Sequence, residues 1–570
     1  MEVAATIRCS ARVLAVAAVP ALAVILILGS GCGQGTRPGN PPDAPFDTVE
    51  FVGTGWGSAP GYHLAWAIQA GGAGLDDPGD YGDSVDFAPN GDLFVSGTMY
   101  SNHVTFGAGT DSEISYYAWE EGCPFLARYS GDGTPIWVAT VGAQEYDVHE
   151  VVAREDGSAV VVGRVSSHKN HPPVFGAGEP GEIVLDVSCT ECPFLAAYRE
   201  DGTFGWVSHG DSEIDSDGRG AFFGLARATD GNWCTGGYFF KSLVLGDAAS
   251  GTAIFSGEQG IRNGFVARYN ADGGLLWARE IRATGTAWPQ PVAALADGSC
   301  AFGVYFQQEV LVNTGGGKPI LIQADGDWSY LVAVYDAGGN LVWAKDIGVV
   351  EGTGSGLDLF AGGAIGSVSA LGDDLVVAGQ FSGSLRAGTE AEPEVISAGS
   401  SEKDRGFYVA RLRGTDGSRV WTSIILGKTN HDRTFDNLSA MAILPGNIVL
   451  VGGGFTGRKI FGAGEAHETE LVSTGPNLDG FLATYNGNGS LLWAVRIVSN
   501  PFPPYPPPYE WGEWVADVAV SGTGSILATG QFLGTATFGT GADDSVDLES
   551  FGDFDVFVLR LDPDDVPATQ

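Results

Sequence analysis

Cysteine residues offer the first chemistry in this sequence. Cys189 and Cys192 form a Cys-x-x-Cys pair, and Cys123 and Cys192 each begin a Cys-Pro-Phe-Leu phrase. Outside the cytosol such a pair is more often a disulfide than a redox or zinc site. Four interpretations stay open: a Cys189–Cys192 bond, a bond involving Cys123, free thiols, or a metal site. The metal site is the least favoured, because the sequence has no second Cys or His pair at the spacing of a zinc site. Cys234 and Cys300 fall in apolar strand segments and are interpreted as core residues.

Carboxylates at alternating positions are the ligands that Ca²⁺ prefers, and one loop has this pattern. Glu213, Asp215 and Asp217 alternate and are followed by a glycine. A twelve-residue calcium loop would place a glutamate at position 224, where this chain has Gly224. The sequence therefore favours a solvated acidic loop over a Ca²⁺ site, and it predicts no other cofactor.

The segment SNPFPPYPPPYEWGEW, Ser499 to Trp514, is the most distinctive candidate for binding. Its prolines favour a stiff, extended chain. Four aromatic side chains, those of Phe502, Tyr505, Tyr509 and Trp511, would form a recognition surface, or the loop would pack as a rigid cover over its neighbours. The sequence has no nucleophile elbow and no helix-borne HExxH motif. We therefore assign no catalytic residue.

The elements that must position these groups come from an internal repeat. Related phrases such as FLARYSGDGTPIWVA and FVARYNADGGLLWAR recur along the chain. Their tryptophans, preceded by an isolated one at Trp66, are spaced 66 to 78 residues apart. The full set is Trp66, Trp137, Trp206, Trp277, Trp343, Trp421 and Trp493. These side chains are interpreted as packing between repeats rather than as a binding site.

Each repeat contains two turn signals. Asn-Gly or Asp-Gly occurs at nine equivalent positions, for instance Asn90-Gly91 in a front half and Asp132-Gly133 in a back half. These dipeptides favour two-residue hairpin turns in which both central residues have positive φ. A repeat is therefore predicted to contain four strands. Tight turns join the first strand to the second and the third to the fourth, and a longer connection, here called the excursion, joins the second to the third. Several excursions contain FGAG or FGTG, which we interpret as a turn with a buried phenylalanine.

The strands are apolar at consecutive positions, as in Leu275-Leu276-Trp277-Ala278. Such strands indicate sheets covered on both faces. The fold class that we predict is all-β, a seven-bladed β-propeller of four-stranded antiparallel blades spanning residues 61–563. The last repeat has only three strands, and the N-terminal strand at Leu64 to Ala70 is expected to complete it and close the ring.

The repeat resembles the bacterial secreted SBBP-type propeller repeat and, more distantly, the quinoprotein-type repeat, whose final strand carries a tryptophan after a turn. The resemblance covers residues 61 to 563. It implies the fold but hardly a function, because propellers host enzymes, scaffolds and receptors alike.

The first 32 residues are typical of a targeting segment, with Arg8 and Arg12 before an apolar run from Val13 to Leu28. Gly29-Ser30-Gly31-Cys32 resembles a lipobox, which implies lipid attachment at Cys32. Residues 33–60 have the composition of a flexible tether, and residues 564–570 form a tail. The predicted location is therefore exported, as an outer-membrane lipoprotein or at the cell surface, with membrane contact only through the lipid anchor.

The chain of 570 residues has a formal net charge of −40. That field repels nucleic acid and anionic lipid headgroups, which excludes a nucleic-acid partner. The leading hypothesis is a non-catalytic module that binds an envelope protein or a glycan. The alternatives are a propeller enzyme (a quinone-dependent dehydrogenase, or a glycan lyase or hydrolase) and a scaffold for outer-membrane assembly. Quinone-dependent propellers usually carry an adjacent Cys-Cys pair, which this sequence lacks.

Overall fold

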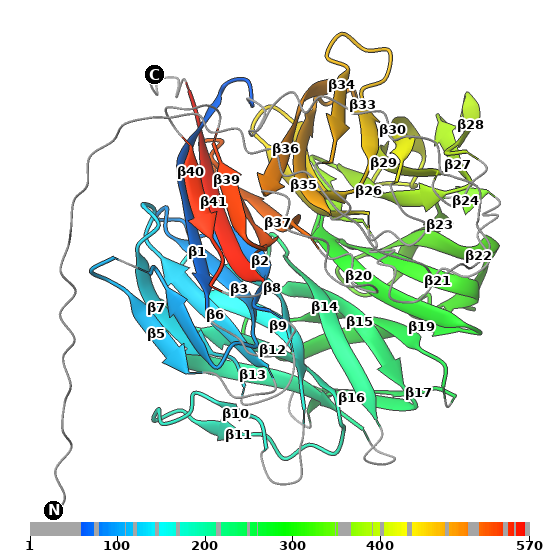
Figure 1. The fold of residues 1–570 in the computed structure, drawn as a ribbon. Helices are drawn as coiled ribbons and strands as arrows, with labels where there is room; N and C mark the ends of the chain where they lie inside the picture. The colour runs from blue at the N-terminus through cyan, green and yellow to red at the C-terminus, as the bar shows by residue number, and fades with distance from the viewer. Residues whose placement is uncertain are drawn as a thin grey trace, which may run out of the picture. The chain divides into compact units, whose positions relative to one another are not determined.

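The structure is a computed structural model. It describes residues 59–72, 79–108, 110–117, 122–142, 147–166, 172–212, 218–247, 251–258, 260–347, 349–350, 366–389, 391–399, 404–429, 436–473, 478–499, 512–539, 545–551 and 554–564. These residues belong to one compact unit, Thr54–Gln570. All helical or extended structure among them is β-strand, and all paired strands are antiparallel (Figure 1). The predicted all-β class is confirmed.

The strands recur in sets of four that follow the sequence repeat. The first strands are β2 (Tyr81–Phe87), β8 (Val148–Ala153), β14 (Arg219–Arg227), β20 (Thr286–Ala294), β25 (Val368–Leu371), β31 (Asn437–Leu444) and β37 (Trp514–Val520). The second strands are β3 (Leu93–Met99), β9 (Ala159–Val165), β15 (Trp233–Phe240), β21 (Cys300–Val312), β26 (Asp374–Ser382), β32 (Ile448–Phe455) and β38 (Ile526–Phe532).

The second half of each set continues the antiparallel order. The third strands are β6 (Cys123–Tyr129), β12 (Cys192–Tyr198), β18 (Asn263–Tyr269), β22 (Ile320–Tyr335), β29 (Asp404–Leu412), β35 (Asp479–Tyr485) and β41 (Asp555–Pro563). The fourth strands are β7 (Pro135–Thr140), β13 (Phe204–Asp211), β19 (Leu275–Ala283), β23 (Leu341–Asp346), β30 (Arg419–Lys428), β36 (Leu491–Ser499) and β1 (Tyr62–Gly71).

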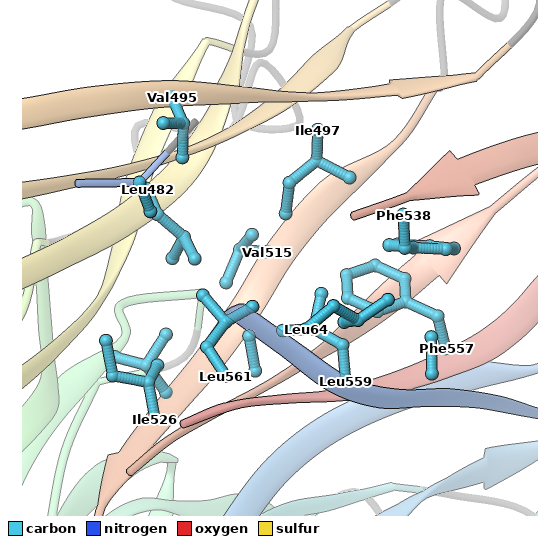
Figure 2. Packing of buried hydrophobic residues seen from close by; sticks show 14 of the residues in the cluster. Leu64, Leu482, Val495, Ile497, Val515, Ile526, Phe538, Phe557, Leu559 and Leu561 are labelled. Carbon is cyan, nitrogen blue, oxygen red and sulfur yellow. The ribbon is translucent and has the colours of Figure 1, made fainter. Parts of the chain in front are cut away.

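Strand β1 is the fourth strand of the last set, although it comes first in the chain. It pairs with β41 from Tyr62↔Pro563 to Ala70↔Val556, and Figure 1 shows the two strands side by side. Side chains of the two strands also pack in one buried cluster, in which Leu64 of β1 lies near Leu559 and Leu561 of β41 (Figure 2). The same apolar cluster includes residues of β35 and β36, so it spans two sets of strands.

The sheets are larger than the four strands that we expected. Most excursions form a hairpin that pairs with the fourth strand of the preceding set. Four hairpins pair in this way: β4 (His103–Phe106) with β5 (Ile114–Tyr117), β16 (Ser242–Asp247) with β17 (Gly251–Ser256), β33 (Arg458–Phe461) with β34 (Thr469–Val472), and β39 (Thr535–Phe538) with β40 (Val546–Glu549). Two further hairpins are β10 (Val174–Phe175) with β11 (Ile183–Val184) and β27 (Ser384–Gly388) with β28 (Pro393–Ser397).

Three excursions depart from that pattern. The hairpin β10–β11 forms a sheet of its own, and β27 pairs with the short strand β24 (Val349–Val350). In the fourth set, β21 and β22 are simply longer, and the end of β21 pairs with β19. That pairing joins two sets into one eight-stranded sheet. The phenylalanines that begin the FGAG and FGTG turns are buried as predicted: Phe106, Phe175, Phe461 and Phe538.

The turns differ from the two-residue type that we expected. Only the glycine has positive φ, as at Gly91 (φ 89°) and Gly133 (φ 86°); the preceding Asn90 and Asp132 do not. The N–H of Gly91 bonds to the Ala88 carbonyl and the N–H of Ala88 to the Asp92 carbonyl. This pattern is a type I turn followed by a left-handed glycine. The Asn90 side chain accepts the N–H of Asp92, which explains why Asn or Asp is used.

The repeating tryptophans join each set of strands to the next. The Trp137 indole donates to the carbonyl of Glu200 at 3.0 Å, and a Cβ on Gly202 would lie only 2.8 Å from the ring. The same bond is made by Trp66 to Gly131, Trp277 to Ala337, Trp343 to Gly414 and Trp421 to Gly487. The interpretation of these tryptophans as packing residues between repeats is confirmed.

The first strands also contact one another in series. Contacts run from β2 to β8, β14, β20, β25, β31 and β37, and β37 contacts β2 again. The first strands therefore surround a common space, which contains the candidate site.

Candidate functional site

A cavity of about 700 Å³ lies between the first strands. All seven first strands contribute to its lining. Six of them carry an irregularity at the same place, where their pairing with the second strand shifts register. A bulge of this kind re-aims a side chain out of the sheet. The unpaired residues all line the cavity: Asp83, His149, Phe223, Gln290, Ser439 and Ala516.

A glycine on the second strand makes five of these six bulges possible. A Cβ on Gly97 would lie 2.0 Å from the Tyr81 carbonyl oxygen, and one on Gly163 would lie 2.1 Å from that of Asp147. The first strand therefore passes too close to the second for any side chain at this point. This contact explains the glycine that ends phrases such as LFVSG and VVVG in the sequence.

The residues after the bulges join neighbouring first strands. Asp517 Oδ2 accepts the N–H of Val85 at 3.0 Å and the hydroxyl of Ser84 at 2.7 Å. Glu150 Oε2 accepts the N–H of Leu225 at 2.9 Å. At the equivalent position between β2 and β8, Ser84 Oγ accepts the N–H of Val151 at 3.2 Å. These side chains satisfy backbone donors that would otherwise be unpaired.

Burial raises the pKa of several carboxyl groups in this region. Burial and the nearby Asp147 raise the pKa of Asp83 well above its ordinary value. Burial raises the pKa of Glu150 strongly, and Asp517 adds to the effect. Burial raises the pKa of Asp86 to about 7, although its carboxylate accepts the N–H groups of Ala153 and Phe87. These groups therefore hold protons near neutral pH.

His149 is the only imidazole in the lining of this cavity among the described residues. Burial lowers its pKa to about 4, so the ring is neutral at physiological pH. The ring stacks on Phe223 with centroids 4.1 Å apart, and its Nε2 has no partner among the described residues. The cavity thus combines neutral carboxyls, a neutral imidazole and aromatic surface.

The sequence-based candidates lie in different places. Cys189 and Cys192 are joined by a disulfide, while the Cys123 thiol is buried and unbonded, with its pKa raised to about 11 by that burial. Cys234 and Cys300 are core residues as interpreted, each fully buried, and a disulfide that the sequence did not predict joins them. They are 66 residues apart, about one repeat, so they occupy equivalent strands of adjacent sets.

The other predicted positions fall outside the described residues. These are the lipid candidate Cys32, the acidic residues Glu213, Asp215 and Asp217, and the aromatic residues Phe502, Tyr505, Tyr509 and Trp511. The last residue of that aromatic segment, Trp514, is described and lines the cavity.

Sequence reasoning did not bring the cavity residues together. A signal for two of them was present, since an acid stands inside the apolar first-strand phrases VHEVV and WVADVAV. No group of three or more His, Cys, Asp or Glu side chains is arranged to hold a metal ion in the described ranges. In that part of the chain, no helix has the length and apolarity needed to cross a membrane.

Comparison with known proteins gives only distant similarity to solved structures. No protein-family model matches the chain, and no curated protein matches it. Among solved structures, the rhamnogalacturonan lyase PL11 of Bacillus licheniformis aligns over 85% of this chain and 84% of its own, with 11% identity and a TM-score of 0.24. An alignment at that TM-score gives no support for a shared fold or activity.

Proposed function

We propose that this chain is a cell-envelope lipoprotein built on a seven-bladed β-propeller, and that it acts as a non-catalytic binding or scaffold module for a protein or a glycan. The observation that carries the proposal is the 700 Å³ cavity, to which each of the seven first strands contributes residues. Ligand sites are typically concave and contain a few placed polar groups within apolar walls. This cavity has that character.

The propeller is supported by two kinds of contact. The first strands contact one another in a series that returns from β37 to β2, as neighbouring blades around an axis would. The pairing of β1 with β41 supplies the fourth strand of the last set. The hairpins that enlarge the sheets attach at the outer, fourth strands and so leave the arrangement of the first strands unchanged.

A binding role is favoured over catalysis by what the carboxylates do. Asp517 and Glu150 each use one oxygen, Oδ2 and Oε2, to accept a backbone N–H group from the neighbouring strand and so hold the sets together. A general base needs an oxygen free to take a proton from substrate. The two disulfides support an oxidising compartment, in agreement with the predicted export.

The test is capture of a partner by the purified full-length chain, using envelope extracts and a glycan array. The Ala516→Phe variant places a ring in the cavity, and Ile136→Phe, at a side chain that is 46% exposed, is its control. A partner held by the wild type and the control but lost by Ala516→Phe supports the cavity as the site. A partner held equally by all three proteins contradicts it. Selective capture of barrel-assembly proteins would instead support the assembly scaffold.

A second candidate is a glycan-cleaving enzyme, which the protonated carboxyl of Asp83 favours. Its raised pKa would suit a general acid, and it faces the cavity. The assay measures release of reducing ends or of unsaturated sugars from a panel of polysaccharides. Release by the wild type that is at least a hundredfold slower in Asp83→Asn would establish this activity. No release by the wild type contradicts it.

A further inference from the structure

Beside the cavity lies a guanidinium group without an acceptor. Arg262 stands just before β18, where its carbonyl accepts the N–H of Ala287. Its Cζ lies 4.3 Å from the ring centroid of Trp288 and 4.6 Å from that of Tyr238. The side chain makes no hydrogen bond or ion pair with the described residues, and its buried Nε has no partner there. Burial lowers the pKa of this group, and the nearby Tyr238 and Glu191 only partly oppose that shift.

Glu191, which attracts Arg262 electrostatically, and the neighbouring Asp147 are already paired with other cations. Arg164 lies 2.7 Å from Asp147 and 3.0 Å from Glu191, and Arg219 lies 3.7 Å from Glu191. Glu191 also accepts the hydroxyl of Tyr238 at 3.2 Å. Among the described residues, three guanidinium groups therefore lie near these two carboxylates. Within this described cluster the cations outnumber the carboxylates, although the net charge of the chain is −40.

An aromatic surface connects this charge to the cavity. Trp288 lies 5.3 Å from Phe223 in an edge-on arrangement, and Phe223 stacks on His149. Phe223 and His149 both line the cavity, whereas Trp288 stands two residues before Gln290, which also lines it. The side chains of Phe223 and Trp288 are partly exposed. An occupant of the cavity mouth would meet an aromatic face on one side and the guanidinium beyond it.

These groups fit one ligand class best. A guanidinium binds a carboxylate through two parallel N–H bonds, and it does so most strongly where water is scarce. Aromatic faces favour the apolar C–H face of a ring in van der Waals contact. A sugar that carries a carboxylate offers both features in one residue.

We propose that Arg262, Trp288 and Phe223 form a subsite for a uronic acid residue, with the sugar carboxylate on the Arg262 guanidinium and the sugar ring against the aromatic surface. The subsite rests on the proposed binding function and specifies its ligand. The net charge of the chain repels a polyanion over a Debye length of roughly 8–10 Å. The ligand is therefore a single uronate, at a chain end or within an otherwise neutral glycan.

The test measures binding of methyl glucuronide and methyl glucoside to the full-length chain by calorimetry. The wild type should bind the glucuronide more tightly than the glucoside. Arg262→Gln should weaken glucuronide binding by about 10- to 100-fold, the worth of a charged hydrogen bond, and leave glucoside binding unchanged. Trp288→Leu should weaken both sugars. Arg282→Gln is the matched control, because Arg282 is 55% exposed and paired with Glu280.

Folding of each variant is checked by its near-ultraviolet circular dichroism, and Arg262→Lys, which keeps the charge but loses the bidentate fork, should retain part of the affinity. Equal glucuronide affinity in the wild type and Arg262→Gln would overturn the proposal, as would no binding by the wild type. Tighter binding of a peptide C-terminal carboxylate than of the glucuronide would overturn the sugar assignment. If partner capture persists while the glucuronide does not bind, the subsite fails and the proposed function stands.

Discussion

At the scale of single residues, the glycines in the turns between third and fourth strands meet two requirements: a positive φ and room for a tryptophan of the preceding set. Gly202 has φ of 85°, and any Cβ there would lie 2.8 Å from the Trp137 ring of the preceding set. Gly231 in a front turn has nearly the same φ, 82°, but nothing lies within 4 Å of its would-be Cβ. The two positions separate the cost of the backbone conformation from the cost of displacing the tryptophan.

Alanine substitutions should therefore differ at these two glycines. Gly231→Ala should lower the free energy of unfolding by about 1–2 kcal/mol, because a left-handed residue gains a side chain. Gly202→Ala should lower it by about 1–3 kcal/mol more, because it also forces Trp137 out of its place. Urea unfolding followed by fluorescence measures both. Equal losses at the two positions would mean that Trp137 contributes nothing to the contact between sets.

The buried Asp86 should make stability depend on pH near neutrality. Burial raises its pKa to about 7, so the folded state favours the protonated acid. The stability it contributes is complete below the ordinary pKa of aspartate, near 4, and is lost as the pH rises through about 7. The melting temperature of the wild type should therefore fall between pH 5 and pH 8.

Asp86→Asn should flatten this part of the pH profile, as measured by calorimetry. Asp132→Asn is the control: its pKa is lowered by a hydrogen bond from Ser130, so it stays ionised throughout this range. Neighbouring Asp517 and Glu150 have raised pKa values too, so some slope should remain in Asp86→Asn. An unchanged slope would show that Asp86 is ionised at all these pH values.

At the scale of the elements, the sequence predicts the strands but not every partner of a strand. The spacing of Trp137 and its equivalents and the Asp-Gly turns set the order of four strands per repeat, because those signals are local. The pairing of the excursion hairpins with the preceding set depends on an open edge of another repeat, which no local pattern encodes. The bulge at Asp83 cannot be predicted from the sequence either. Its cause is the close approach of the first strand to Gly97 on the second strand, which only the structure shows.

The candidate site shows the same limit. An acid within an apolar strand, as at Glu150, marks a buried polar group, but only the structure shows that its oxygen accepts a neighbour's N–H. Arg262 carries no sequence signal, because only the structure shows that its Nε has no partner among the described residues and that Arg164 and Arg219 pair with Glu191. Cys234 and Cys300 did carry one, since their separation is about a repeat.

The Cys234–Cys300 disulfide joins β15 to β21 across two sets and should stabilise the protein measurably. It closes a loop of 66 residues, and its removal by the double change to alanine should cost about 2–4 kcal/mol in urea unfolding. Cys189 and Cys192 are only three residues apart, so the same change there should cost less. Alkylation of Cys234 or Cys300 in the oxidised, denatured protein would contradict the bond.

At the scale of the whole molecule, the excursion hairpins leave unpaired sheet edges that acids protect. Strands β28, β34 and β40 end their sheets, and exposed Val395 and Val472 lie on two of them. Acidic residues alternate with the apolar ones, as at Glu394 and Glu470. Charges on an edge strand discourage pairing with another molecule.

Acidification should therefore cause association at these edges. Near the isoelectric point of about 4.3, the acids lose charge and the strands keep their unpaired backbone groups. Light scattering at pH 4.5 should show assembly that is absent at pH 7.5, and Val395→Lys with Val472→Lys should reduce it. Assembly of this double variant equal to that of the wild type would place the contacts elsewhere.

The pairing of β1 with β41 also determines when folding can finish. Leu64 meets Leu561, so the first strand to leave the ribosome must wait for nearly the last one. The entropy of closing so long a loop grows only slowly with its length, yet such non-local pairing makes folding slow. Until that moment both strands present open edges. A chain of this design is therefore most vulnerable to misassembly during synthesis, when its other contacts between repeats can already be made.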